Sequence, residues 1–240
     1  MLIYIDVETI PSQRPDARDL VRQHVKPPGT YRKPESIAAW HATEGPGAVE
    51  EAWRKQSLDG GTMGEIASIA MLTDDDRWFV HCRRPGESEA ELLQMAFATV
   101  EAWTEADARA MLPGRSETFP VDDHHLVAHN AAFDLGFLWR RSVVNDVPRP
   151  SWLPGPMARV GRDYTCTMQL WAGYGKTVSL DNLCLALGVP SPKNGALDGS
   201  MVFDAWLDHR SAVIAEYNLR DVYAVREVYH RMLGLPRAAA

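Results

Sequence analysis

The sequence predicts an α/β fold in which helices cover a mixed β-sheet. Residues 1–10, 64–73 and 77–84 read as strands, and a short apolar run at 125–130 reads as a fourth. Helical stripes follow the third and fourth strands, and the C-terminal part of the chain is mostly helical. At 240 residues, of which 45% are hydrophobic, the chain is long enough to bury a core of this kind.

The first strand, LIYIDVET, carries two acids where an apolar strand is expected. Side chains of a strand alternate between its faces, so Ile3, Ile5 and Val7 form a core face. Asp6 and Glu8 share the opposite face, and two like charges side by side repel unless something positive lies between them. Either this strand end runs into water, or a cation is expected there.

The chain between the first and second strands reads as an insertion within a single domain that spans residues 1–240. Residues 11–60 hold several prolines and nearly balanced charge, and they predict short helices at Pro34–Trp40 and Val49–Lys55. Periodicity and turn residues predict the elements that follow. In chain order these are strands 64–73 and 77–84 joined by the turn Asp74–Asp76, helix Glu87–Trp103, strand 125–130, helix Ala132–Val143, a Pro- and Gly-rich loop at 145–163, short helices near 165–171 and 179–187, the loop PSPKNGALDGS, and a helical region from about 201 to 233.

Composition excludes some classes of protein. No apolar run approaches the roughly 20 residues that cross a bilayer. The N-terminus has no basic leader, so we expect no secretion signal. The 3 cysteines are widely spaced, which favours reduced thiols and a cytoplasmic location. A net charge of −7 argues mildly against a non-specific nucleic-acid binder, but a metal-dependent nuclease is an exception, because bound divalent ions reverse the local sign.

The last predicted helix has a carboxylate on its packing face. Its stripe consists of Ile214, Tyr217, Asp221, Val225, Val228 and Met232. Asp221 interrupts an otherwise apolar seam, and Tyr217, one turn earlier, can reach the same point in space. A lone carboxylate on such a face is costly unless it is paired or bound to a metal.

A further acid lies where a predicted strand gives way to a helix, in VAHNAAFDLGFL. Asp134 shares a helical face with Phe137 and Leu138, and Asn130 precedes the helix. Asn130 can be the helix N-cap, and the helix dipole favours an acid in the first turn, so neither residue requires a functional role. Short acidic patterns also recur by chance. The conjunction of three segments with acids on interior faces favours a functional site.

Taken in order, these segments resemble the three motifs of the DEDD 3′–5′ exonucleases, which are proofreading-type nucleases on a ribonuclease H-like fold. The motifs are Asp-x-Glu on the first strand, an Asn, Phe and Asp set at a strand-to-helix junction, and Tyr-x-x-x-Asp on a late helix. The matching residues are Asp6, Glu8, Asn130, Phe133, Asp134, Tyr217 and Asp221.

The resemblance is to the tyrosine subclass of these enzymes. The histidine subclass would place His five residues before the last acid, but Glu216 occupies that position and Tyr217 fills the tyrosine slot. The segments LGVPSPKNGALDGSMVFDAW and IAEYNLRDVYAVREVY look like predicted exonucleases related to the proofreading domain of family B DNA polymerases. The resemblance covers residues 1–10 and about 62–234, so the 11–60 insertion lengthens the path between the first two motifs.

The resemblance implies hydrolysis of a terminal phosphodiester with two divalent ions, Mg²⁺ or Mn²⁺, about 3.5–4 Å apart. Asp6 would bridge both ions, and Glu8 and Asp221 would complete the nucleophile-side ion. Asp134 would hold the other ion through water. Tyr217 would orient the attacking water by a hydrogen bond.

The implied substrate is the 3′ end of a nucleic acid, with single-stranded DNA as the first expectation. Asn130 and Phe133 would face the terminal nucleotide, as would Thr9 and Ile10, because frayed bases stack on aromatic or apolar groups. Ordinary core packing explains Phe133 and Ile10 equally well.

Other functions remain open on the sequence alone. The same fold fits an RNA exonuclease, an idle nucleic-acid-binding domain of a replication assembly, or hydrolysis of a small nucleotide. Replication or repair proteins are possible partners, and no membrane is expected. In the insertion, Trp40, Trp53, Arg54 and Lys55 could help to hold the strand, although a small satellite cluster with a solvated rim is the simpler interpretation.

Overall fold

The computed structural model describes residues 1–111, 124–193 and 197–235, and a five-stranded sheet in the order β3-β2-β1-β4-β5 lies at its centre. β1 pairs antiparallel with β2 and parallel with β4, while β2–β3 is antiparallel and β4–β5 is parallel. The sheet is therefore mixed, as the sequence predicts. The strands are β1 (Leu2–Ile10), β2 (Glu65–Thr73), β3 (Trp78–Cys82), β4 (His125–Ala128) and β5 (Tyr164–Cys166).

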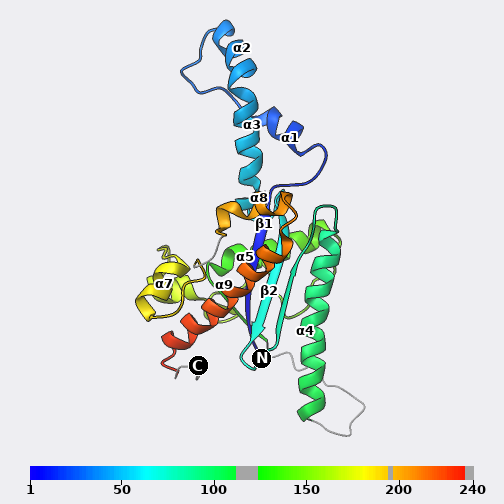
Figure 1. Cartoon of the computed structure of the whole chain (residues 1–240), viewed down its shortest axis with the longest axis vertical. Helices are drawn as coiled ribbons and strands as arrows, with labels where there is room; N and C mark the ends of the chain where they lie inside the picture. Colours follow the sequence, from blue (N-terminus) through cyan, green and yellow to red (C-terminus); the bar gives the residue numbers. More distant parts are fainter. Residues whose placement is uncertain (112–123, 194–196, 236–240) are drawn as a thin grey trace.

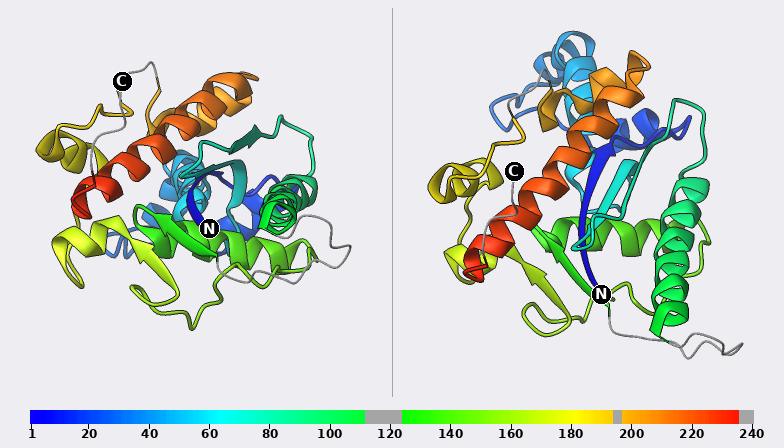
Figure 2. Two further views of the ribbon diagram at one scale, coloured as in Figure 1. Left: turned by 90° about the horizontal axis from the view of Figure 1, so that it is seen from below. Right: turned by 60° about the horizontal axis from the view of Figure 1, so that its bottom comes forward.

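Helices cover both faces of this sheet (Figure 2). α4 (Glu89–Met111) and α5 (Ala131–Val144) pack on the apolar face of β1, which includes Ile5. α9 (Ser211–Met232) crosses the opposite face, where it buries Tyr4. β1 is therefore enclosed from both sides, and the acids that follow Tyr4 on the same face lie beneath α9.

The C-terminal helical region consists of two helices joined by a tight turn. α8 (Val202–Leu207) ends before His209, whose φ of +58° lies in the left-handed region. A non-glycine residue seldom adopts this conformation, and a helix cannot continue through it. Because the chain turns here, α8 packs at the end of the sheet while α9 runs diagonally across its face (Figure 1).

Two elements escaped the sequence prediction. Helix α1 (Ala17–His24) was not expected within the insertion. The short helix predicted near 165–171 begins only at Thr167, as α6 (Thr167–Ala172), because the three residues before it form the edge strand β5. Three residues carry too little alternation to identify a strand. The predicted helix near 179–187 agrees with α7 (Leu180–Leu187).

Residues 11–60 form an arm that projects from the end of the sheet (Figure 1). Its elements are α1, α2 (Pro34–Thr43), α3 (Gly45–Arg54) and the 3-10 helix η1 (Lys55–Leu58). The arm is fastened at its base, where the indole N–H of Trp53 donates to the carbonyl of Ser12 at 2.9 Å. The Trp53 ring also packs edge-on against Phe203 of α8, with the ring centroids 5.2 Å apart. Trp53 therefore belongs to a core cluster, as the satellite-cluster interpretation requires.

Three other sequence expectations can be compared with the structure. Cys82, Cys166 and Cys184 are all buried and free of disulfides. Among the described residues, no helix combines the length and the apolar character that crossing a membrane requires. The predicted loop PSPKNGALDGS lies partly outside the described residues.

Candidate active site

The parallel pairing of β1 with β4 ends early, and this leaves the second half of β1 open on one side. The paired register runs from Leu2 opposite His125 to Tyr4 opposite Val127 and stops there. β1 continues to Ile10 and stays paired with β2, with a register shift after Glu8. The acids of β1 thus lie at the carboxyl ends of parallel strands, where α/β sheets commonly form their sites.

Three carboxylates meet over this part of β1. One oxygen each of Asp6, Glu8 and Asp221 lies within 4.8 Å of the other two. They converge because α9 crosses β1 on the face that carries Asp6 and Glu8, and Asp221 lies midway along α9. Within residues 1–111, 124–193 and 197–235, this is the group of His, Cys, Asp or Glu side chains close enough to hold a metal ion.

Asp134 approaches the same region from α5. Its Oδ1 accepts a hydrogen bond of 3.1 Å from the backbone N–H of Val7, a donor that lies beyond the reach of β4. The residue is only 3% exposed. Among the neighbouring charges, that of Asp134 contributes most to raising the pKa of Asp6. Asp134 is therefore a fourth member of the acidic group electrostatically, although it lies outside the closest trio.

The four acids oppose one another's ionisation. Burial raises the pKa of Asp134 to about 7, and it raises the pKa of Asp221 to about 7 as well. For Asp6 and Glu8, burial and then the charges of the neighbouring acids raise the pKa well above the usual range of a carboxyl group. The site therefore binds protons more tightly than ordinary carboxylates do, because burial and the neighbouring acids both disfavour the ionised forms.

The donor set fits a divalent cation. Mg²⁺ and Mn²⁺ prefer carboxylate oxygens, and the oxygens of Asp6, Glu8 and Asp221 are close enough to share one ion. Lys193 and Arg220 lower the pKa of Asp221, but burial outweighs both. A dication would stabilise the ionised carboxylates directly, since bound ions are the largest local charges in such sites.

α9 adds two polar side chains to the group. Tyr217 is buried, and the hydrogen bond that its hydroxyl donates lowers the pKa of Asp221. Burial and the nearby acids raise the pKa of Tyr217, so its phenol remains a proton donor at neutral pH. The amide of Asn218 donates to Oδ2 of Asp6 at 2.6 Å and accepts from the hydroxyl of Ser68 at 2.9 Å. This relay fixes the orientation of the Asp6 carboxylate.

Asn218 was missed by the sequence analysis. It is fully buried, and it precedes the buried Val222 by one helical turn, beside the stripe that holds Asp221. An amide at such a position is the signal that could have identified it, because a buried amide needs polar partners.

Two of the expected substrate residues, Thr9 and Ile10, are the last residues of β1, and they differ in burial. The side chain of Ile10 is fully buried in the cluster that contains Trp53, as the core-packing alternative requires, so only its backbone could face a nucleotide. Thr9 is half-buried, and its hydroxyl donates to the carbonyl of Ser57 in the arm at 2.6 Å. Thr9 thus links the site to the base of the arm.

The other two expected substrate residues begin α5. Asn130 is exposed, and its backbone lies in the left-handed region with φ of +56°. Its side chain does not form the N-cap hydrogen bond that the sequence suggested. Phe133 is half-buried, and its ring lies 4.8 Å from that of Phe137, centroid to centroid. Part of the Phe133 ring and the whole Asn130 amide remain available to a ligand.

Comparison with known families identifies the class of protein. A family described as "Predicted 3'-5' exonuclease related to the exonuclease domain of PolB" matches residues 62–236. The chain belongs to this family. The matched stretch of this exonuclease contains Asp134, Tyr217 and Asp221, whereas Asp6 and Glu8 precede it. Only the fold reveals that the two groups of acids meet.

A solved structure shares the fold. The family B DNA polymerase from the hyperthermophilic archaeon Pyrobaculum calidifontis is similar to this exonuclease, with a TM-score of 0.54 and 16% sequence identity over 97% of the chain. The match covers 24% of the polymerase chain. It confirms the expected ribonuclease H-like sheet flanked by helices. No curated protein matches the sequence.

Proposed function

We propose that this exonuclease is a metal-dependent enzyme of the tyrosine subclass that removes nucleotides from the 3′ end of single-stranded DNA. One observation carries the proposal. Asp6 and Glu8 lie outside the family match, yet their oxygens meet that of Asp221, inside it, within 4.8 Å. A family relationship alone would not require this convergence, whereas a carboxylate site for metal-assisted hydrolysis does.

The acids would divide the metal ligation between them. In this proposal Asp6, Glu8 and Asp221 would hold one Mg²⁺ or Mn²⁺ ion, and Asp134 would help to hold a second one together with Asp6. When bound, such ions lower the pKa of water and neutralise charge on the leaving oxygen. The hydrogen bond from Asn218 keeps the carboxylate of Asp6 directed toward this position.

The remaining side chains would position the reacting groups. Because its pKa is raised, Tyr217 cannot serve as a base at neutral pH, and its hydroxyl acts by donating or sharing a hydrogen bond with the attacking water. Asn130 offers an exposed amide to the last nucleotide, and Phe133 offers part of a ring on which a base can stack.

A strand-shortening assay tests the proposal. Wild-type protein with Mn²⁺ should convert a 5′-labelled single strand into a ladder of products shortened from the 3′ end, and should release mononucleotides. A strand with a blocked 3′ end and a reaction with EDTA should both remain intact. An RNA strand of the same sequence, digested in parallel, tells whether DNA is preferred. If metal-replete protein leaves both strands intact while a control nuclease digests them, the proposal is wrong.

Tyr217→Phe is expected to lower kcat by about 10-fold to 10²-fold with little change in metal affinity, since the variant loses only a hydroxyl next to the ligands. Single-turnover rates and Mn²⁺ titrations of the two proteins measure these effects separately. An unchanged kcat would remove Tyr217 from the mechanism.

Asn218→Ala is expected to lower kcat by about 10-fold to 10²-fold and to move the acidic limb of the pH–rate profile to higher pH. The reason is that the hydrogen bond from Asn218 lowers the pKa of Asp6, so its loss makes Asp6 harder to ionise. The buried Ser68 hydroxyl also loses a partner, at a cost of about 1–3 kcal/mol of stability. Reduced stability with an unmoved pH profile would mean that Asn218 has a purely structural role.

A further inference from the structure

The arm is the part of the molecule that the proposed chemistry leaves unused. It precedes the stretch of residues 62–236 that the family match covers. It nevertheless begins where the site ends, because β1 carries Asp6 and Glu8 and then leads directly into it. Its last turn, η1, also touches the site strand through the hydrogen bond between Thr9 and Ser57. A feature attached at this point can influence what reaches the carboxylates.

The arm is built as a strut. α2 and α3 share the single joining residue Glu44, whose N–H bonds to the carbonyl of Trp40 and whose carbonyl accepts from Ala48. The two helices therefore follow one another end to end (Figure 1). Each has 10 residues, and at 1.5 Å per residue the strut extends about 30 Å. At its base, Arg54 pairs with Asp204 of α8 at 2.9 Å, which adds to the anchoring by Trp53.

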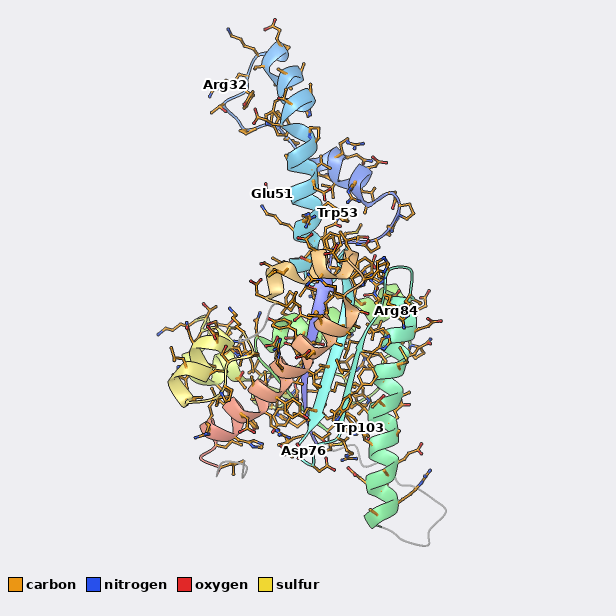
Figure 3. The ribbon with its side chains drawn as sticks, in the orientation of Figure 1. Arg32, Glu51, Trp53, Asp76, Arg84 and Trp103 are labelled. Atoms are coloured by element: carbon orange, nitrogen blue, oxygen red, sulfur yellow. The ribbon has the colours of Figure 1, made fainter. Side chains whose placement is uncertain are left out.

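The Lys and Arg side chains elsewhere in the arm form ion pairs, but those at its tip do not. The ion pairs of the arm are Arg14–Asp16, Arg18–Glu50, Arg22–Asp19, Arg54–Glu50, Arg54–Asp204 and Lys55–Glu51. The tip is the loop of residues 25–33 that joins α1 to the outer end of α2, and its Lys26, Arg32 and Lys33 are exposed and form no ion pair within the described parts of the chain. Figure 3 shows Arg32 at this distal end, away from the sheet. The sequence has no acid between Asp19 and Glu35.

The tip therefore concentrates free positive charge on a chain whose net charge is −7. The hydroxyl of Tyr31 donates to Glu44 at 2.9 Å, which ties the loop of the tip to the joint of the strut. Cations held on a rigid support and left without acidic partners suit a regularly charged polyanion. The polyanion that an exonuclease meets is its own substrate.

We infer that the tip of the arm, formed by Lys26, Arg32 and Lys33, binds the phosphate backbone of the nucleic acid whose 3′ end occupies the carboxylate site. This inference rests on the proposed function. A strand stacked as in a duplex advances about 3.4 Å per nucleotide, so a strut of about 30 Å spans roughly nine such nucleotides, and fewer nucleotides of an extended single strand. The arm thus makes binding depend on substrate length, while the chemistry at the 3′ end does not depend on the arm.

The test uses the full-length triple variant Lys26→Gln, Arg32→Gln and Lys33→Gln. For a single strand of about 30 nucleotides, Kd and KM should rise about 10-fold to 10²-fold at low salt, and the dependence of log Kd on log salt should weaken by about 2. For a strand of about three nucleotides, too short to span the strut even when fully extended, KM and kcat should match those of the wild type.

A matched control removes the same charge from another part of the surface. Arg84, Arg109 and Arg162 are exposed and lie outside the arm, so their triple replacement by Gln changes net charge equally. This control should leave the preference for the longer strand intact. If both triple variants lose affinity alike, net charge and not the arm is responsible, and the inference is overturned.

Binding and activity are measured separately so that the inference and the proposed function can fail independently. Fluorescence anisotropy in EDTA reports binding without cleavage. If the wild type binds the long strand more tightly than the short one through the tip but degrades neither, the proposed function fails and the arm inference stands. If the wild type binds both lengths equally, or the tip variant weakens both equally, the tip does not contact the backbone and an acidic protein becomes the better partner.

Discussion

Asp6→Asn is expected to lower kcat/KM on a single strand by at least about 10³-fold, because ligation of a catalytic metal contributes several kcal/mol and each 1.36 kcal/mol is a factor of ten in rate. Asp6 lies in the closest carboxylate trio, and Asn218 already orients it. Asn preserves the shape of the side chain but supplies no charge. Steady-state kinetics with saturating Mn²⁺ measures the effect.

The control for this variant is an acid outside the site. Asp208 is exposed in the turn between α8 and α9, so Asp208→Asn removes the same charge and should retain wild-type activity. In EDTA, Asp6→Asn should also be more stable than the wild type, because it removes one of four acids that repel one another. Full activity of Asp6→Asn would remove the carboxylate trio from the mechanism.

The second large effect concerns stability in the absence of metal. The pKa values of Asp134 and Asp221 are raised to about 7, above those of the unfolded chain. At pH values between the unfolded and the folded pKa, the folded protein therefore binds more protons than the unfolded one. The stability that these two groups contribute is therefore fully present below the pKa of the unfolded chain and is lost as pH rises through about 7. We expect a loss on the order of 3 kcal/mol between about pH 5 and pH 8 in EDTA.

Denaturant titrations at several pH values measure this loss. Burial also lowers the pKa of His129, so the unfolded chain holds this proton more tightly, and this residue alone would make stability rise with pH. The raised pKa values of the four carboxylates act in the opposite direction and outnumber it. Mn²⁺ should reverse the loss at the higher pH, since a ligand that binds only the folded state stabilises it by about 2.7 kcal/mol at 100 times its Kd. Stability that rises with pH in EDTA would contradict the assigned cluster.

The sequence singled out the acids because each broke a clear pattern. Asp6 and Glu8 ended an apolar strand, and Asp221 interrupted a helical seam, so periodicity alone put them on interior faces. That these faces meet could not be read from periodicity. It depends on the diagonal path of α9, which the left-handed turn at His209 makes possible.

Other features escaped prediction for identifiable physical reasons. Asn130 reads as an N-cap, but its backbone is left-handed and its side chain makes no capping hydrogen bond, and the residue type alone does not reveal the sign of φ. Ile10 follows the acids on β1 and so looked like part of the substrate surface, but the arm covers it. The strut was predicted only as two short helices, because a shared joining residue such as Glu44 leaves no sequence signal of collinearity.

The central claim is that the carboxylates of β1 and α9 form one metal site, and anomalous diffraction from crystals grown with Mn²⁺ tests it most directly. The account predicts a strong anomalous peak bonded to oxygens of Asp6, Glu8 and Asp221, which disappears or weakens greatly in Asp6→Asn crystals. Crystals of active protein with no peak at these oxygens, and Mn²⁺ bound elsewhere, would contradict it.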